Sequence, residues 1–474
     1  MENKSSGRIW PLALIAVAAI GFYLYSTIEV RPSASAGRPT GSVEDLEALA
    51  TRDDTNIVFV LVDTLRAERM SAYGYDRETT PFLSELAETG IRFDHHIAQS
   101  SWTKSSMASI WTSLNPIRSG VTKFNHAISA DATMPAEILK EHGFRTVGLY
   151  RNGWVHGYFG FDQGFDKYYR PMGAKVNPAV QRMRPNAQAF GADENMMDDA
   201  IEFLRIQGKT SRWLLYLHLM DLHEYTYDEE SALFGNTVPD LYDNSVRRTD
   251  WVISTLYDYL RKSDLLKKTI FVVLSDHGEA FGERGFEGHA REVFPETTET
   301  PLIISLPFTL PSGVVVETRT TNVDVWPTLL DLMGLPDGRE MDGRSRRPQI
   351  LAAARGQQGG IRDATENEAD DFAVAFLDEN WGRPGSNRKP AISVLDGDYR
   401  YVAGTDHAGR AFEVLLSTED GESVDRKREH PEILARLKAQ AAAELEQEQL
   451  YETETFELDQ MQLDQLRALG YDIP

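Results

Sequence analysis

The chain has 474 residues, a net charge of -24 and no cysteine. The length allows one large domain or a large domain with a smaller partner. The acidic balance argues against a nucleic-acid partner, because neutralising phosphates requires clustered Lys and Arg. The lack of cysteine excludes disulfides, thiolate metal sites and a cysteine nucleophile.

The N-terminal segment predicts a membrane anchor. Trp10–Tyr25 is apolar, and extended to Ile28 it is about long enough to cross a bilayer as a helix of ~20 residues. Lys4 and Arg8 precede this run, so the positive-inside tendency places the rest of the chain in the periplasm or the extracellular space. Cleavage as a signal peptide near Ala34–Ala36 is the alternative, but that site lies some way from the apolar run.

Two apolar runs typical of buried strands end in acidic residues. Asn56–Val62 is followed by Asp63, and Ile270–Leu274 is followed by Asp276 and His277. In an open parallel sheet, ligands gather beyond the carboxyl ends of the strands. Carboxylate and imidazole groups placed there suit a divalent metal ion. The alternative is a polar loop whose aspartate caps a helix.

The segment Ser100–Ser113 begins with hydroxyl side chains and then takes on a helical pattern. A hydroxyl at a helix N-terminus lies beside free backbone N–H groups, where an anion binds well and a nucleophile can be activated. Plain N-capping is the alternative for any one of these hydroxyls.

Strand and helix patterns alternate through the first 350 residues, and shorter strand patterns follow. The main strands are expected at 56–62, 145–150, 213–219, 270–274 and 301–306, and the main helices at 80–90, 135–142, 195–206, 240–262 and 323–333. This alternation predicts an α/β fold with a mostly parallel sheet covered by helices on both faces. Short runs at 372–377, 391–395, 399–402 and 412–416 predict a small antiparallel sheet, and 431–448 a charged helix.

These patterns divide the chain into five parts. The expected parts are a membrane anchor (1–28), a tether (29–54), a catalytic domain (55–350), a polar loop (351–371) and a C-terminal subdomain (372–474).

Several stretches together resemble the sulfatase branch of the alkaline-phosphatase superfamily. They include NIVFVLVDTLRAERMSAYGY, SSWTKSSMASIWTSLNP, LHLMDLHEY, FVVLSDHGEAFGE, GHAREVFPETTETPLII, VDVWPTLLDLMGLP and the terminal LRALGY, in matching order and spacing. The resemblance runs from about Asn56 to Tyr471. It implies an alkaline-phosphatase-like, doubly wound α/β body with a small C-terminal α+β subdomain. It also implies an ester hydrolase that uses one divalent metal ion (Mn, Zn or Ca) and a covalent intermediate.

The resemblance assigns roles to individual residues. Asp63, Asp276 and His277 fall on metal-ligand positions. Thr103 falls where sulfatases place the Cys or Ser that is oxidised to formylglycine, so it is the expected nucleophile and a further metal contact.

Two histidines and two charged residues complete the expected site. His223 and His289 fall where the family places side chains that touch the ester's anionic oxygens or protonate the leaving group. For each, a structural histidine is the alternative. Arg66 and Glu279 are expected to orient the metal ligands.

The chain departs from the family pattern at several positions. Thr64 replaces the second aspartate of the usual pair, Met107 replaces the arginine of the C/S-x-P-S-R signature, and Ser105 replaces its proline. The GKWHLG-like motif is missing, which leaves Arg151 or Asn152 for that wall of the site.

The threonine changes the expected chemistry. It cannot become formylglycine by the family's usual modification, but a metal ion can activate it as an alkoxide. Superfamily members with threonine at this position act on phosphorus esters. The prediction is therefore a phosphoester hydrolase or phosphotransferase in which Thr103 attacks and His223 or His289 acts as general acid. Lys104 could supply the positive charge lost with Met107, or it could point to solvent.

Two other functions stay open from the sequence. A true sulfatase is favoured by the overall resemblance and disfavoured by the threonine. A catalytically silent binding protein is suggested by Thr64 and Met107. The expected substrate is a small-molecule, glycan or lipid ester chosen by loops such as Gly173–Phe190, and the membrane is an expected partner through the N-terminal helix.

Overall fold

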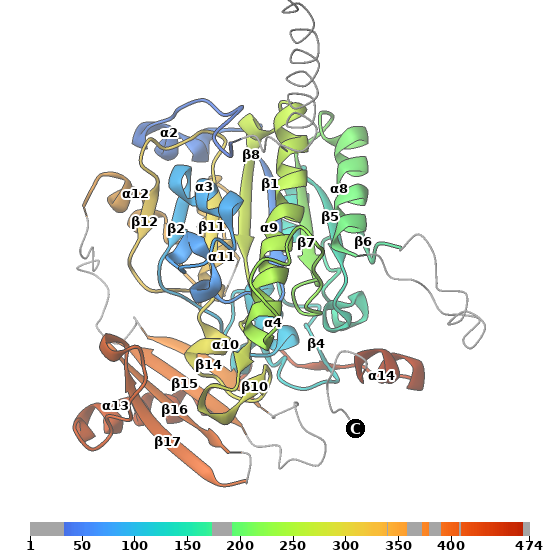
Figure 1. Cartoon of the computed structure of the whole chain (residues 1–474). Coiled ribbons are helices and arrows are strands. Elements are labelled where there is room, and N and C mark those ends of the chain that lie inside the picture. Colours follow the sequence, from blue (N-terminus) through green and yellow to red (C-terminus); the bar gives the residue numbers. More distant parts are fainter. Residues whose placement is uncertain are drawn as a thin grey trace, which may run out of the picture.

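The computed structural model describes residues 33–172, 192–338, 340–357, 372–378, 390–406 and 409–467. Within these residues the main body has three layers, a central sheet with helices on each side (Figure 1). A smaller four-stranded sheet lies at one end of this body.

The central sheet is mixed and has eight strands, in the order β12-β2-β11-β8-β1-β7-β5-β6. The strands are β1 Asn56–Val62, β2 Ile91–Phe93, β5 Arg145–Tyr150, β6 Lys167–Tyr169, β7 Trp213–Leu219, β8 Thr269–Leu274, β11 Leu302–Ser305 and β12 Val314–Val316. β1 pairs in parallel with both β7 and β8, whereas β11 runs antiparallel to β8 and β2. Every residue of β1, β7 and β8 is buried, as apolar strands covered on both faces require.

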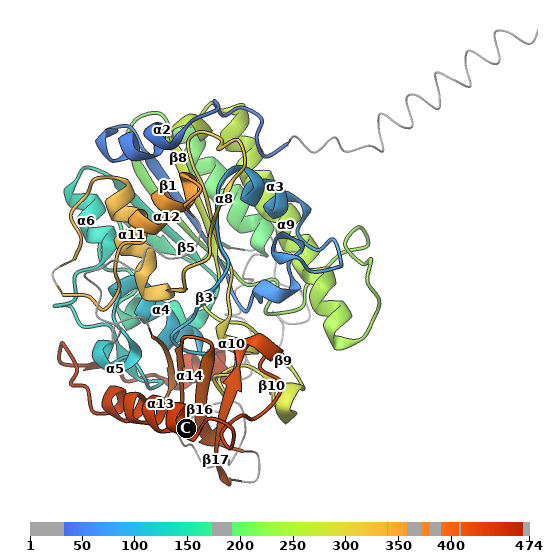
Figure 2. The same cartoon turned by 90° about the vertical axis from the view of Figure 1, so that its left-hand side faces the viewer.

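Helices cover both faces of this sheet (Figure 2). One face packs against α3 Pro81–Thr89, α8 Asp193–Gln207 and α9 Val238–Lys262, and the other against α4 Thr103–Thr112, α6 Pro135–Glu141, α11 Val325–Leu332 and α12 Arg347–Ala354. Side chains alternate along a strand, so Val58 and Val60 join the first core and Phe59 and Leu61 the second.

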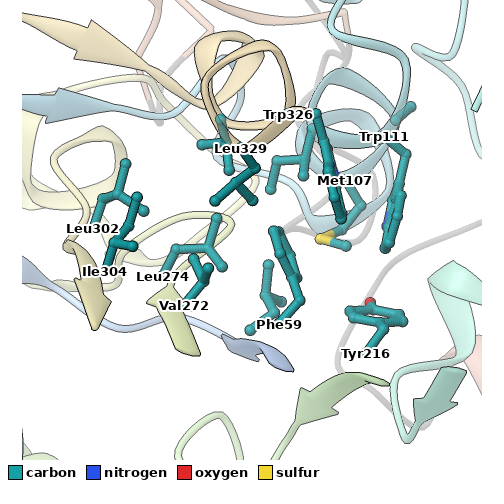
Figure 3. Packing of buried hydrophobic residues seen from close by; sticks show 14 of the residues in the cluster. Phe59, Met107, Trp111, Tyr216, Val272, Leu274, Leu302, Ile304, Trp326 and Leu329 are labelled. Atoms are coloured by element: carbon teal, nitrogen blue, oxygen red, sulfur yellow. The ribbon is translucent and has the colours of Figure 1, made fainter. Parts of the chain in front are cut away.

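The second core is rich in aromatic rings close to α4. Phe59 stacks on Trp326 with ring centroids 4.9 Å apart, and Trp111 packs against both (Figure 3). Met107, where the family carries arginine, is fully buried in this core. The core therefore gives α4 a fixed position on the sheet.

The C-terminal part forms the small antiparallel sheet that the sequence predicts. Its order is β14-β15-β16-β17, with bounds Ala373–Leu377, Ala391–Asp396, Tyr399–Thr405 and Ala411–Ser417. The helices that follow are α13 Pro431–Leu445 and α14 Gln460–Arg467. The domain boundaries at 55–350 and 372–474 stay a prediction.

The remaining elements are short. They are helices α2 Val43–Ala48, α5 Pro116–Ser119 and α10 Pro295–Thr298, and the strand pairs β3 His96–Ile97 with β13 Thr320–Thr321, β9 Ala280–Phe281 with β10 Glu287–Gly288, and β4 His126–Ala127 with β18 Glu454–Thr455.

The described part of the expected tether packs on the body. Ala34 is fully buried, and Arg38 donates from Nη1 to Ser305 Oγ at 2.8 Å and to the carbonyl oxygen of Leu306 at 3.1 Å. Residues 33–54 therefore contribute to the fold. The expected polar loop begins inside α12, and its residues 358–371 lie outside the described ranges, as do 173–191.

The prediction of an N-terminal transmembrane helix is corrected. Crossing a bilayer requires about 20 consecutive, mostly apolar residues in one helix. Among the described residues no helix is both long and apolar enough to do this. α9 has the length, with 25 residues, but charged side chains recur along it. The expected anchor, residues 1–28, lies outside the described ranges, and the membrane-anchored, extracytoplasmic location is corrected with it.

Candidate active site

Two neighbouring strand ends bring the expected metal ligands together. β1 and β8 run in parallel with Leu61 opposite Leu274, so the residues that follow them lie at the same edge of the sheet. Asp63, Asp276 and His277 each offer one ligand atom within 4.8 Å of the others, and all three are buried. His277 Nε2 lies 3.4 Å from Asp276 Oδ2 and 3.8 Å from Asp63 Oδ1.

The donor atoms of this group fit a divalent cation. Asp63 Oδ1 and Asp276 Oδ2 are buried and have no hydrogen-bond partner within the described part of the chain. Leaving two buried carboxylate oxygens unpaired is costly, and a cation between them would remove that cost. Burial raises the pKa of Asp276 well above its usual value, and the charge of Asp63 adds to this. A bound cation would reverse the shift. Carboxylate and imidazole ligands suit several divalent metals.

Thr103 lies beside this group because it is the first residue of α4. Its Oγ1 is 3.1 Å from His277 Nε2 and accepts a hydrogen bond from Asn152 Nδ2 at 3.3 Å. The first backbone N–H groups of a helix have no partner inside the helix. The hydroxyl, the helix N-terminus and the candidate metal ligands therefore meet in one place.

The second oxygen of Asp63 is held by two side chains. Asp63 Oδ2 accepts from Asn152 Nδ2 at 2.6 Å and lies 3.0 Å from His218 Nε2. Asn152 follows β5, which fits the expectation that Arg151 or Asn152 lines this wall. His218 was not expected from the sequence. The available signal is a single polar residue at a buried position of the strand WLLYLHL.

Three imidazole rings lie in a row next to Thr103. The ring centroids of His277 and His289 are 4.6 Å apart, and those of His289 and His223 are 4.9 Å apart. His289 Nδ1 is 3.0 Å from Glu279 Oε2, so Glu279 orients this ring. His223 Nε2 is buried and has no hydrogen-bond partner among the described residues.

Burial keeps these imidazoles neutral. It lowers the pKa of His277 to about 3 and that of His289 to about 4, and it lowers the pKa of His223 against the field of Asp63. Burial also raises the pKa of Glu279 to about 7. Neutral imidazoles can ligate a metal ion or accept a proton.

The expected basic residues are engaged in other contacts. Arg66 donates from Nη1 to the carbonyl oxygen of Glu279 at 2.7 Å and to Glu283 Oε1 at 2.9 Å. It therefore holds the loop after His277. Lys104 is fully buried and donates to the carbonyl oxygen of Phe124 at 2.7 Å, so the alternative that it points to solvent is wrong.

Arg151 binds a group of acidic side chains. It forms ion pairs with Asp193 at 2.7 Å and Glu224 at 2.9 Å, and a further pair with Asp221. Glu224 is the neighbour of His223, so Arg151 ties the end of β5 to the segment that carries this histidine. The charge of its guanidinium group is therefore neutralised by these carboxylates.

The backbone of the site is strained at Thr64. Thr64, at the position where the family carries a second aspartate, has a φ of 64°. A β-branched residue rarely adopts this left-handed region, and such outliers gather at functional sites. Its Oγ1 donates to the carbonyl oxygen of Asp63 at 2.6 Å.

A buried polar network joins α4 to the end of β8. Ser106 Oγ donates to the carbonyl oxygen of Asp276 at 2.6 Å, and Asn322 Nδ2 donates to Ser106 Oγ at 3.2 Å. His96 Nε2 lies 2.8 Å from Asn322 Oδ1, so this histidine takes part in the network. Asn322 was not expected from the sequence, because an isolated asparagine carries no motif.

An α/β sheet edge, a donor set suited to a metal ion and a hydroxyl beside that set are together typical of metal-dependent ester hydrolases. The family model described as Sulfatase matches residues 55–335, and the chain belongs to the sulfatase family. The chain is thus a hydrolase acting on ester bonds. Sulfatase family enzymes bind a divalent metal ion, and Asp63, Asp276 and His277 are the group available for one.

The chain is also similar in sequence or fold to individual known ester hydrolases. N-acetylgalactosamine-6-sulfatase of Rattus norvegicus is 24% identical over 362 residues, which cover 66% of this chain and 69% of that protein. A structure solved in complex with its substrate D-glucosamine-2-N,6-O-disulfate is 17% identical with a TM-score of 0.64, covering 82% of this chain and 97% of that one. The phosphonate monoester hydrolase of Agrobacterium radiobacter is 16% identical with a TM-score of 0.62, covering 82% and 95%. At these identities the solved structures establish a shared fold.

Proposed function

We propose that this chain hydrolyses phosphate esters through a covalent intermediate on Thr103. The observation that carries the proposal is the position of Thr103 Oγ1, 3.1 Å from His277 Nε2 and thus beside the group Asp63, Asp276 and His277, in which each aspartate has one buried oxygen without a partner among the described residues. A hydroxyl beside a cation site at a helix N-terminus is suited to attack an anionic ester.

The identity of the nucleophile favours phosphorus over sulfur. A formylglycine has a geminal hydroxyl that expels sulfate, and a plain threonine ester has none. A phosphoryl-threonine can be hydrolysed by direct attack of water on phosphorus. The expected reaction is therefore hydrolysis of a phosphate mono- or diester, with transfer to an acceptor alcohol as its variant.

The reaction has two displacements. In the first, the Thr103 hydroxyl gives up its proton as Oγ1 forms a bond to phosphorus, the bond from phosphorus to the leaving alcohol breaks, and the leaving oxygen takes up a proton. His223, whose Nε2 has no hydrogen-bond partner in the described residues, or His289 is placed to accept the proton of Thr103 as a neutral imidazole and then give it to the leaving oxygen as general acid. In the second, water attacks the phosphoryl group, gives up a proton, and releases phosphate and the free Thr103 hydroxyl.

The remaining residues prepare these steps. Asn152 directs a hydrogen bond at Thr103 Oγ1, which orients the hydroxyl. The N–H groups of the first turn of α4 favour an anion in front of the helix. A divalent cation, when bound, would neutralise charge that develops on the ester oxygens.

Hydrolysis of sulfate esters is the second candidate. It is favoured by a specific observation, the match to relatives named as sulfatases. We propose that the natural substrate is an ester of a small molecule, a glycan or a lipid.

A substrate panel on the purified protein tests the proposal. p-Nitrophenyl phosphate, bis-p-nitrophenyl phosphate and p-nitrophenyl sulfate are each assayed with Mn²⁺, Zn²⁺ and Ca²⁺. We expect phosphoester turnover that falls by about 10³-fold or more in Thr103→Ala. Thr112→Ala, which removes a buried hydroxyl from the other end of α4, is the matched control and keeps turnover. Mass spectrometry of quenched reactions should find a phosphorylated peptide containing Thr103.

The outcomes separate the candidates. Release of sulfate without phosphate would establish a sulfatase and reject the phosphoester proposal. Metal binding without turnover of any ester would identify a binding protein.

A further inference from the structure

We propose that Tyr216 and His218 form a relay that positions Asp63 for the cation, which makes His218 a positioning residue for metal binding. The inference rests on the metal site of the proposed function and extends it to a neighbouring strand.

The sheet places the relay next to Asp63. β7 pairs in parallel with β1, with Leu61 opposite His218. Asp63 directly follows β1 and comes two residues after Leu61, so its side chain is expected on the same side of the sheet as that of Leu61. Tyr216 and His218 are likewise two residues apart and project from the matching face of β7.

The hydrogen bonds run in one direction. His218 Nε2 is 3.0 Å from Asp63 Oδ2, and His218 Nδ1 is 2.8 Å from the hydroxyl oxygen of Tyr216. A carboxylate only accepts, so Nε2 donates to Asp63. In a neutral imidazole Nδ1 then accepts, and the Tyr216 hydroxyl donates to it. Burial raises the pKa of Tyr216 well above its usual value, so the hydroxyl keeps its proton.

The relay decides which oxygen of Asp63 faces the cation. Oδ2 is occupied by His218 and by Asn152, whereas the buried Oδ1 has no partner in the described chain and lies 3.8 Å from His277 Nε2. Fixing one oxygen by hydrogen bonds leaves the other aimed at the ion. Asn152 shares this task, but it also bonds to Thr103, so a change there would disturb the nucleophile too.

The aromatic core holds the start of the relay in place. The Tyr216 ring packs edge-on against Trp111 with centroids 5.0 Å apart and against Phe59 at 6.1 Å (Figure 3). Tyr216 and His218 are both fully buried. Interiors this well packed leave few alternative rotamers. The packed core therefore fixes the Tyr216 ring, and through the two hydrogen bonds it fixes the orientation of His218 and Asp63.

The test measures metal affinity without substrate. Mn²⁺ binding to the purified full-length protein is followed by electron paramagnetic resonance and calorimetry for the wild type, His218→Leu, His218→Gln and Tyr216→Phe. Loss of a side chain that orients a metal ligand typically weakens metal binding by about 10- to 100-fold, and we expect this for His218→Leu. His218→Gln, whose amide can donate to Asp63, should recover much of the affinity. Tyr216→Phe should fall between them, because His218 loses the donor that fixes its tautomer.

Tyr168→Phe is the matched control. The Tyr168 ring packs on Tyr216, and its hydroxyl donates to the carbonyl oxygen of Val155 instead of to His218. We expect it to bind Mn²⁺ as the wild type does. The relay is rejected if folded His218→Leu and Tyr216→Phe also bind Mn²⁺ with wild-type affinity. If His218→Leu does not fold, the comparison of Tyr216→Phe with Tyr168→Phe decides alone. Neither result depends on whether Thr103 attacks a phosphoester, which the substrate panel decides separately.

Discussion

At the scale of single residues, the site is dominated by two buried carboxylates that face one imidazole. Asp63 and Asp276 each have one oxygen without a hydrogen bond within the described residues. Burial raises the pKa of Asp276, and the charge of Asp63 raises it further. Such an arrangement disfavours the metal-free fold and favours cation binding. Metal affinity and stability should therefore be linked.

Replacing Asp276 should remove this link. With free Mn²⁺ at 100 times its dissociation constant, the wild type should gain about 2.7 kcal/mol of unfolding free energy. Asp276→Asn should lose this gain, because it removes a charged ligand, and it should be more stable than the wild type in EDTA. Urea denaturation with and without Mn²⁺ measures both effects.

Asp243→Asn is the control for that experiment. Asp243 is also a buried aspartate, but it pairs with Arg69 and Arg77. This variant should be less stable overall and still show the full gain with Mn²⁺. An equal gain in Asp276→Asn would mean that Asp276 is not a ligand.

At the scale of elements, α4 determines where the hydroxyl of Thr103 lies. The helix is buried along its whole length, and the Ser106 hydroxyl anchors it to the carbonyl oxygen of Asp276. Ser105, its neighbour, is equally buried, but its hydroxyl has no hydrogen-bond partner in the described structure. Comparing the two serines therefore distinguishes the effect of losing the hydrogen bond from the effect of changing a buried side chain.

Ser106→Ala should therefore be more damaging than Ser105→Ala. Losing the anchor should cost about 1 kcal/mol of unfolding free energy, and it should lower kcat because Thr103 is less well placed. Ser105→Ala removes an unsatisfied hydroxyl and should be neutral or slightly stabilising. Denaturation and turnover are measured side by side, and equal effects for the two serines would contradict an anchoring role.

At the scale of the whole molecule, a buried arginine joins the C-terminal sheet to the main body. Arg400 of β16 is fully buried and bonds to Glu422, in the segment that follows β17, and to Glu299 of the body, each at 2.7 Å. β14 adds a backbone contact, from the N–H of Phe376 to the carbonyl oxygen of Gln99, close to the start of α4. The small sheet therefore supports the segment that carries Thr103.

Arg400→Met should weaken this junction strongly. Removing one partner of a buried ion pair typically costs about 3–5 kcal/mol, and here the carboxylate of Glu422 would stay buried without its countercharge. Arg410→Met, on the exposed hairpin of the same sheet, breaks a solvent-exposed pair with Asp406 and should change little. The measurement is the unfolding free energy. A small effect of Arg400→Met would show that the sheet is held mainly by apolar contacts.

A second global effect should appear in the pH dependence of stability. Burial raises the pKa of Glu444 in α13 to about 7, and the nearby Asp342 adds to this. The folded state therefore holds this proton more tightly than the unfolded chain does. The contribution of Glu444 to stability is greatest below its ordinary pKa of about 4.5 and falls as the pH rises through about 7.

Glu444→Gln should remove this loss. The unfolding free energy of the variant minus that of the wild type should be greater at pH 8 than at pH 5, by on the order of 1 kcal/mol or more. Urea denaturation at the two pH values gives the difference. Glu446→Gln, an exposed neighbour, should follow the wild type at both. If Glu444→Gln loses as much unfolding free energy between pH 5 and pH 8 as the wild type does, another titratable group causes the pH dependence.

Local pattern predicted the main strands well. β1 and β7 have the expected bounds, and β8 begins one residue earlier, because unbroken apolar runs of this length suit only buried strands. β2 and β12 were not expected, since three residues are too few to show a period. The antiparallel direction of β11 was also invisible, because an apolar strand reads the same in either direction.

The sequence by itself determined the α/β class, the acidic ends of β1 and β8 and the hydroxyl at the start of α4, because each is written in adjacent residues. The tertiary structure decided that His218 and Asn322 join them, and that Asn152, one of the two residues which the sequence left open, bonds to both Asp63 and Thr103. These contacts depend on strand order and on which face each side chain takes. Both are set by packing between segments that lie far apart in the chain, and this packing leaves no local periodicity to read.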